Sequence, residues 1–456
     1  MIESLLVANR GEIARRVIAT ARRLGVRTVA VHSDVDAELP FVREADEAVP
    51  LGPAAPAESY RNAEKILAAA ESTGARAIHP GYGFLSENAD FARRVHAAGL
   101  TWVGPDPDVI DLMGDKIRAR NAAAAAGMPV APGTTEPVAD EAAAVSAAAG
   151  IGYPIMVKAA AGGGGMGLAV ATTEEELRKH VRTVRGFAER MFGDAGILLE
   201  RYYPEARHVE VQLLGLADGT VTALGERNCS VQRRNQKLVE ETPAHGLDPG
   251  LRERMIAAAI QVGKAVGYRS AGTVECLVHG EPGEQDYVFL EMNTRLQVEH
   301  PVTEAVWGLD LVEQQLRIAS GLPPSVDLAA LRPRGHAVEF RVNAEDPIRF
   351  LPGPGSITEW NEPAGEGVRI DAGYAHGTTV TPSYDSLMAK LIVHADTREA
   401  ALARARAALE SFTISGPKHN LPFHGELLDE PSFAAGTYTT AVLTRMRAAR
   451  GPEPVS

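Results

Sequence analysis

Short apolar runs alternate with helically spaced apolar positions at the start of the chain. Runs at 4–8, 27–31 and 76–78 are typical of buried strands, and the stretches 11–24 and 59–73 have the apolar spacing of helices. Strands that alternate with helices predict βαβ units, whose strands pair in parallel. The pattern therefore predicts an α/β fold with a parallel sheet. The first strand-to-helix turn, NRGE, lacks GxGxxG and does not indicate dinucleotide binding.

The middle of the chain predicts a second, compact unit. A helix is expected over 115–126, ending at Gly127-Met128-Pro129, and a compact block follows from about 130 to 204. Apolar runs inside this block predict three strands, at 154–158, 168–171 and 197–200. Later strands and helices alternate, and GLPPSV at 321–326 is typical of a loop near a domain boundary.

The run FLEMNTRLQVEHPVTE at 289–304 alternates polar and apolar side chains. Every second position is polar: Glu291, Asn293, Arg295, Gln297 and Glu299. An extended backbone would place all five on one face, over about 26 Å if straight. A solvated strand face would alternate too. Because one small site cannot use that length unless the chain bends, we expect two adjoining subsites: oxygen ligands for Mg²⁺ first, then an anion clamp with a nearby base.

A second carboxylate is expected beside that run. Glu275 lies in the apolar segment GTVECLV, and the turn-rich HGEPGEQD separates it from Glu291. The two strands are therefore expected to pair antiparallel, bringing Glu275, Glu291 and Asn293 together as a Mg²⁺ site (or Mn²⁺). The alternative interpretation is a pair of surface carboxylates.

A glycine run lies between two apolar strands. The glycines Gly162, Gly163, Gly164, Gly165 and Gly167 would let backbone N–H groups approach a phosphate, although a flexible hairpin tip explains the same pattern. Two lysines, Lys158 and Lys116, favour the first interpretation because both could hold a polyphosphate.

Composition narrows the class of protein. The chain has 456 residues, enough for about three domains, and a net charge of −13 argues against general nucleic-acid binding. Only two cysteines, Cys229 and Cys276, are present, which indicates a reducing compartment rather than a disulfide framework. No apolar stretch is long enough to cross a bilayer, and MIESLLVANRGE does not look like a signal peptide. We expect a cytoplasmic protein that binds neither membrane nor nucleic acid.

Taken together, the motifs resemble biotin carboxylase, the ATP-grasp enzyme that carboxylates biotin. Besides 289–304, the segments that carry the resemblance are VANRGEIARR at 7–16, HPGYGFLSEN at 79–88, MGDK at 113–116, YPIMVKAAAGGGGMG at 153–167, RHVEVQ at 207–212, ERNCSVQRRNQK at 226–237, GHAVEFRVNAEDP at 335–347 and PSYDSLMAKLI at 382–392. The resemblance implies an ATP-grasp fold in three parts: a Rossmann-like domain over 1–114, an ATP-grasp domain over 115–330 with a mobile lid at about 131–204, and a C-terminal α+β domain over 331–446.

The resemblance also implies roles for named residues. Glu299 would take the proton of bicarbonate, which Lys237, Arg295 and Gln297 would hold. Arg341 would stabilise the biotin enolate. The remaining candidates would bind ATP or biotin: Lys116, Lys158 and the glycines at the phosphates, Glu200 at the adenine hinge, Tyr203 near the base, His208 near the ribose, Tyr82 close to biotin, and Gln232 and Val298 at the cofactors.

Three positions depart from the family pattern. Met166 replaces an arginine at the lid tip, Asn235 replaces a histidine in QRRNQK, and Leu168-Ala169 lacks a basic residue. A lost charged hydrogen bond costs on the order of 1.5–3 kcal/mol, so weaker ATP binding or altered lid closure is expected.

Partners follow from what the chain lacks. Neither MAK at 388–390 nor MRA at 446–448 resembles a biotin attachment site. We therefore expect a separate biotin carboxyl carrier protein, a carboxyltransferase subunit and, from the resemblance, a homodimer, acting in an acetyl-CoA or related carboxylase. Two alternatives remain open: an ATP-grasp ligase that carboxylates urea, guanidine or an amine, and a non-catalytic subunit that binds nucleotide.

Overall fold

The computed structural model describes residues 1–160 and 167–450. The predictions for Gly162, Gly163, Gly164, Gly165 and Met166 lie outside the described residues. Within the described part, no helix combines the length and apolar character that a membrane span requires.

A five-stranded parallel sheet forms the N-terminal part, as the alternation of strands and helices predicted. Its strand order is β3-β2-β1-β4-β5, and every neighbouring pair is parallel. Its elements are β1 (Ser4–Val7), α1 (Gly11–Arg23), β2 (Arg27–Ser33), α2 (Pro40–Glu44), β3 (Glu47–Gly52), α3 (Ala63–Thr73), β4 (Ala77–His79), α4 (Ala89–Ala97), β5 (Thr101–Trp102) and α5 (Pro107–Gly114). The helix expected over 59–73 begins only at Ala63, because the Asn62 side chain accepts a hydrogen bond from the Lys65 N–H and caps it there.

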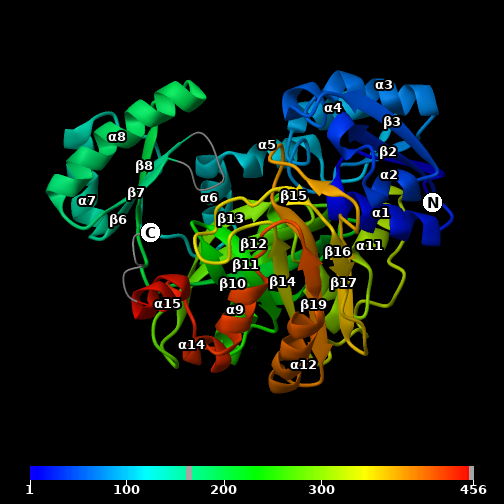
Figure 1. The fold of residues 1–456 in the computed structure, drawn as a ribbon. Coiled ribbons are helices and arrows are strands. Elements are labelled where there is room, and N and C mark those ends of the chain that lie inside the picture. Colours follow the sequence, from blue (N-terminus) through cyan, green and yellow to red (C-terminus); the bar gives the residue numbers. More distant parts are fainter. Residues whose placement is uncertain (161–166, 451–456) are drawn as a thin grey trace.

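A small lobe follows, and Figure 1 shows it set apart from the body of the molecule. The helix α6 (Lys116–Ala125) precedes it, and its elements are α7 (Glu141–Ile151), β6 (Ile155–Ala159), β7 (Leu168–Ala171), α8 (Glu174–Phe192) and β8 (Ile197–Arg201). The three strands form an antiparallel sheet in the order β7-β6-β8. The lobe buries an apolar core of its own, in which Leu177 and Val181 of α8 meet Val157 and Leu199 of the sheet.

An eight-stranded antiparallel sheet forms the centre, in the order β13-β12-β9-β10-β11-β14-β19-β17. Its strands are β9 (Arg207–Gly215), β10 (Val221–Arg233), β11 (Gln236–Thr242), β12 (Ser270–His279), β13 (Asp286–Asn293), β14 (His336–Asn343), β17 (Val368–Ala372) and β19 (Leu387–Ala395). The surrounding helices are α9 (Pro249–Ala265), α10 (His300–Trp307), α11 (Leu311–Ala319), α12 (Arg398–Ser411), α13 (Leu421–Leu428), α14 (Pro431–Ala434) and α15 (Val442–Arg450). Short strands β15 (Gly355–Ser356), β16 (Glu359–Asn361), β18 (Thr379–Val380) and β20 (Thr413–Ser415) complete the fold.

This central sheet crosses the boundary expected near residue 330. Strand β11, from the middle of the chain, pairs directly with β14, from its C-terminal part. A single buried core also joins α1 of the N-terminal part to β14 and β19. Side chains from all three parts of the chain can therefore meet on one face of this sheet.

Candidate active site

The chain bends in the middle of the alternating run. Strand β13 ends at Asn293, residues 294–299 leave the sheet, and α10 begins at His300 with Glu299 at its N-cap. The extended backbone expected over 291–299 is therefore wrong beyond Asn293. The helix start explains the turn: the Gln297 carbonyl lies 2.8 Å from His300 Nδ1, and Pro301 occupies the first helical turn, where proline is favoured.

The bend brings the polar side chains of the run together. The Arg295 guanidinium donates to Asn293 Oδ1 (2.6 Å) and to Gln297 Oε1 (3.0 Å), while Gln297 Nε2 donates to Glu275 Oε1 (2.9 Å). Arg295 also donates to Glu87 (2.9 Å), which comes from the N-terminal part of the chain. The two adjoining subsites expected from the sequence are thus linked by direct hydrogen bonds.

Lys237 lies at the centre of the site and contacts three carboxylates. Its ammonium lies 2.5 Å from Glu210, 2.8 Å from Glu275 and 2.7 Å from Glu299. The contacts to these carboxylates hold the pKa of Lys237 well above its ordinary value, against the effect of burial. This cation therefore keeps its charge at neutral pH.

Glu299 is fully buried between two cations. One oxygen accepts from Lys237, and the other accepts from Arg341 at 3.0 Å. Burial alone would raise the pKa of Glu299, but the charges of Lys237, Arg341 and Arg227 hold it well below its usual range. The carboxylate is therefore ionised at neutral pH.

Arg341 bridges Glu299 to a second buried acid. Its Nε donates to Glu240 at 2.7 Å, and burial raises the pKa of Glu240 to about 7 despite the Arg341 charge, with Glu299 adding to the rise. Of the two acids on this guanidinium, Glu299 has the lowered pKa and Glu240 the raised pKa.

The carboxylates of the expected metal site lie in one row. Glu275 pairs directly with Glu291 across β12 and β13, so the predicted antiparallel pairing is confirmed. Asn293 Nδ2 lies 3.3 Å from Glu291 Oε1. Neighbouring protein atoms and the charge of Glu275 raise the pKa of Glu291, although its side chain is exposed to solvent. Two neighbouring carboxylates at a solvent-facing edge fit a hard divalent cation, which would relieve their repulsion. Asn293 turns its amide nitrogen to Glu291, because its oxygen accepts from Arg295.

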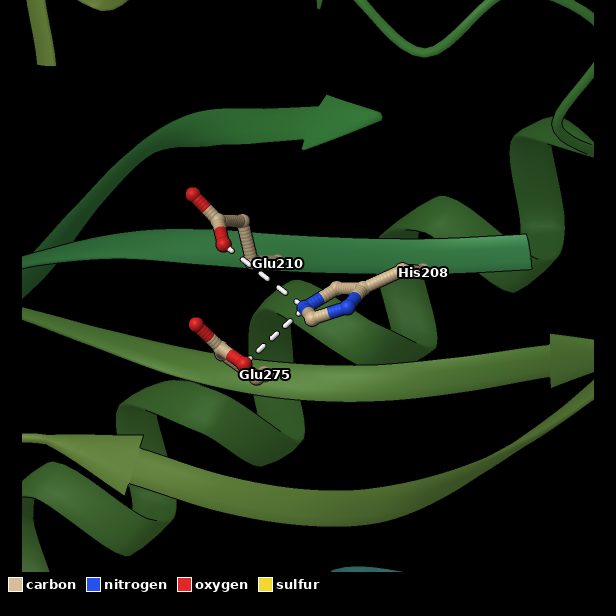
Figure 2. Close-up of side chains that lie close together, drawn as sticks. All are labelled: His208, Glu210 and Glu275. Carbon is tan, nitrogen blue, oxygen red and sulfur yellow. Dashed lines mark ion pairs between the residues drawn. The ribbon is translucent and has the colours of Figure 1, made fainter. Parts of the chain in front are cut away.

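His208 and Glu210 extend this row on the neighbouring strand. Glu210 pairs with Glu275 across β9 and β12. His208 Nε2 lies 2.9 Å from Glu275 and 3.8 Å from Glu210. Figure 2 shows the imidazole facing both carboxylates. Its other ring nitrogen lies 2.7 Å from Gln232 Nε2. Because Glu210 is already neutralised by Lys237 and Arg227, the outer end of the row, at Glu291, is the part best placed to take a cation.

The two lysines of the expected phosphate site lie near one another, at the end of strand β6. Lys116 donates to the carbonyl of Ala159 (3.3 Å), and Lys158 on β6 forms an ion pair with Glu200 on the neighbouring strand β8. Burial and the positive charge of Lys158 lower the pKa of Lys116. Two cations that repel one another are stabilised by an anion placed between them. Gly167, at the end of the run, has φ of +68°, a conformation that favours glycine.

The remaining predicted residues lie at two separate edges of the site. Tyr203 stacks on His279, with ring centroids 4.3 Å apart and the planes tilted by 9°. Tyr82 donates to the buried carboxylate Glu12 on α1. The Val298 carbonyl accepts from Lys390 at 2.9 Å. Tyr82 thus approaches the Glu299 side of the site, and Tyr203 lies with the strands that follow the small lobe.

Sequence reasoning missed four charged residues of the site. Glu210, Arg227, Glu240 and Glu87 each bind one of the predicted residues or bind one another, and Arg227 is fully buried, donating to Glu210 at 2.6 Å. The signal was the presence of charges inside apolar strand patterns, as in RHVEVQ, where a buried charge requires a partner.

The Asn235 departure has a local structural explanation. Arg234 and Asn235 form the two-residue turn between β10 and β11, with φ of +48° and +68°. Hairpins of this kind need positive φ at both positions, and asparagine tolerates it well among residues with a side chain.

Known protein families match nearly the whole chain. Residues 1–110 match the family described as biotin carboxylase, N-terminal domain, residues 115–325 match the carbamoyl-phosphate synthase L chain, ATP binding domain, and residues 339–445 match the biotin carboxylase C-terminal domain. Biotin carboxylase of Halalkalibacterium halodurans is 47% identical over 99% of this chain and 100% of the relative. Biotin carboxylase of Haemophilus influenzae is 48% identical over 96% of this chain and 97% of the relative.

Solved structures agree with the sequence relatives. A biotin carboxylase–β,γ-ATP complex from Campylobacter jejuni has a TM-score of 0.94 at 42% identity and covers 98% of this chain and 99% of that one. The biotin carboxylase domain dimer of Hydrogenobacter thermophilus 2-oxoglutarate carboxylase, complexed with MgADP, ADP and bicarbonate, has a TM-score of 0.94 at 42% identity and covers both chains fully. The ATP-grasp fold expected from the motifs is confirmed, and the chain belongs to the biotin carboxylase family of ATP-dependent ligases.

Proposed function

We propose that this enzyme carboxylates biotin on a separate carrier protein, using bicarbonate and ATP through carboxyphosphate. The reaction would be the first half-reaction of an acyl-CoA carboxylase or a related carboxylase. The observation that carries the proposal is the position of Glu299, an ionised acid between Lys237 and Arg341. The proposed base, Glu299, is thus in direct contact with Lys237 of the anion clamp and with Arg341, the cation that would stabilise the enolate.

Activation of bicarbonate begins at the anion clamp. Lys237, Arg295 and Gln297 would bind the bicarbonate oxygens, and Glu299 would take its proton. Bicarbonate oxygen then attacks the γ-phosphorus of ATP, the bond from that phosphorus to the β-bridging oxygen breaks, and ADP leaves. Bicarbonate that shares Lys237 with Glu299 weakens the hold of this cation on the acid, which raises the basicity of Glu299 when bicarbonate is bound.

The triphosphate would lie over Lys116 and Lys158, with Glu200, Tyr203, His208 and Gln232 towards the nucleoside. The mutual repulsion of the two lysines supports this placement, since an anion removes it. Glu275, Glu291 and Asn293 would hold Mg²⁺ or Mn²⁺, which when bound neutralises phosphate charge.

Transfer to biotin would take place beside Arg341. Carboxyphosphate breaks down to CO₂ and phosphate, and the phosphate removes the N1 proton of biotin. The resulting enolate oxygen is stabilised by Arg341, with Tyr82 and Val298 nearby, and N1 attacks CO₂ to form carboxybiotin. Arg341 supports this role because it remains charged between Glu240 and Glu299.

The relatives support a proposal about the partners. The propionyl-CoA carboxylase alpha chain of Ruegeria pomeroyi is 45% identical over 97% of this chain, which spans only 68% of that longer protein. We infer that a biotin carboxyl carrier protein and a carboxyltransferase work with this enzyme in the cytoplasm. The Hydrogenobacter thermophilus dimer supports a homodimer.

The direct test measures ATP cleavage with and without bicarbonate and free biotin. Cleavage that requires bicarbonate and rises with biotin supports the proposal. Cleavage that rises instead with urea, guanidine or an amine would support a ligase acting on another acceptor, and cleavage indifferent to every acceptor would overturn the biotin assignment.

A further inference from the structure

A buried lysine outside the predicted site contacts the segment that carries Glu299. Lys390 lies in the middle of β19, is fully buried, and donates to the Val298 carbonyl at 2.9 Å. Its ammonium lies 3.0 Å from Glu12 on α1 and 3.8 Å from Asp371 on β17. Three elements distant in sequence thus hold one cation against the peptide that precedes Glu299.

The register of the central sheet places this lysine beside Arg341. Lys390 pairs directly with Arg341 across β14 and β19, and residues directly opposite on adjacent strands project from the same face. Arg341 binds the carboxylate of Glu299, while Lys390 binds the carbonyl of Val298. Two neighbouring cations therefore hold consecutive residues: Arg341 binds the side chain of Glu299, and Lys390 binds the backbone of Val298.

We infer that Lys390 is a positioning residue, which fixes the peptide between Val298 and Glu299 and thereby the direction of the Glu299 carboxylate. The inference rests on the proposed function, in which Glu299 takes the bicarbonate proton. Residues 294–299 belong to no strand or helix, so their direction depends on such side-chain contacts. A small misplacement of a reacting group lowers the rate strongly even when binding is unchanged.

Glu12 gives the arrangement a second link to the site. The same carboxylate that faces Lys390 accepts a hydrogen bond from Tyr82, which we place near biotin. Burial raises the pKa of Glu12, and the nearby Lys390 charge opposes that rise. The ion pair between Glu12 and Lys390 therefore links Tyr82, in the N-terminal part of the chain, to the Val298 carbonyl.

The test separates positioning from simple stabilisation of the core. Lys390→Met removes the Val298 contact but also leaves the buried carboxylate of Glu12 without its cation. The charge-balanced double variant Lys390→Met/Glu12→Gln is therefore compared with it. We expect the double variant to regain thermal stability while kcat stays lower by about tenfold or more, with KM for ATP within about twofold of the parent. Recovery of kcat together with stability would overturn the inference.

A control variant and a second measurement complete the test. Arg398→Met breaks another buried ion pair, which joins the start of α12 to Glu241 of β11. The hydrogen bonds of Arg398 go to Glu241, Phe433 and Ala434 and not to residues 294–299. This variant should lower stability without changing kcat. Hydrogen exchange over 294–302 should speed up in the double variant and stay unchanged in the control; unchanged exchange in the double variant would also overturn the inference. Hydrogen exchange reports on residues 294–302 directly, so it tests the positioning role of Lys390 even if the parent enzyme showed no biotin-dependent turnover.

Discussion

Replacing Glu299 by glutamine separates the chemistry of this site from its architecture. The substitution keeps the size of the side chain and one acceptor oxygen, but it removes the charge and the ability to take a proton. In the structure, Glu299 is fully buried, with Lys237 2.7 Å from one oxygen and Arg341 3.0 Å from the other.

The structure sets the size of the two effects. A general base contributes about 10²–10⁴-fold to a rate, so bicarbonate-dependent ATP cleavage should fall by that factor. Stability should fall less than in most breaks of a buried ion pair, which cost about 3–5 kcal/mol when one charge is stranded. Here Lys237 keeps Glu210 and Glu275, and Arg341 keeps Glu240, so a loss of about 1–3 kcal/mol is expected.

The assay follows two outputs, phosphate release and carboxybiotin formation, together with nucleotide affinity. Glu299→Gln should lose both outputs and keep ATP binding. Arg341→Ala should lose carboxybiotin while part of the bicarbonate-dependent ATP cleavage survives, because Arg341 is proposed to act on biotin.

A matched control lies on the same guanidinium. Glu240→Gln makes the same chemical change on the other acid that binds Arg341. Because burial raises the pKa of Glu240 while the pKa of Glu299 is lowered, loss of the Glu240 charge should cost less, and activity should fall less than about tenfold. If Glu299→Gln cleaved ATP normally and Arg341→Ala lost both outputs equally, the assigned roles would be wrong.

Three further predictions concern the metal, the lid and acid stability. Glu275→Gln and Glu291→Gln should each lower turnover and raise the Mg²⁺ requirement, and parental activity at limiting Mg²⁺ would exclude that residue as a ligand. Met166→Arg, outside the described residues, should lower KM for ATP because a guanidinium can pair with phosphate oxygens; an unchanged KM would count against this contact. The pKa of Glu241 is lowered to about 2 because His336 and Arg398 outweigh the effect of burial. A lowered pKa stabilises the fold fully above the unfolded value of 4.5, and the benefit disappears as pH falls towards 2. Glu241→Gln should therefore cost about 3 kcal/mol at neutral pH and about half as much or less near pH 3, as unfolding measurements at both pH values would reveal.

Local pattern predicted the elements well where a single periodicity persists. The apolar runs and helical stretches at the N-terminus predicted the parallel sheet, and the turn-rich segment between two strands predicted the pairing of Glu275 with Glu291. Both results depend on residues close in sequence, whose geometry follows from backbone period and turn chemistry. The alternation over 291–299 failed beyond Asn293, because a period of two cannot indicate where a helix start interrupts the strand.

The sequence by itself thus determined the class of fold, the family and the residue types of the site. It did not determine which charges meet. Lys237 reaches Glu210 and Glu275 because β9, β11 and β12 lie in one sheet, and it reaches Glu299 where the chain bends between β13 and α10. Lys390 lies beside Arg341 because β14 pairs with β19. A charge is stable in an apolar interior only when an opposite charge or a hydrogen bond meets it there. Strand order and register determine which opposite charges come into contact, and both are properties of the tertiary structure.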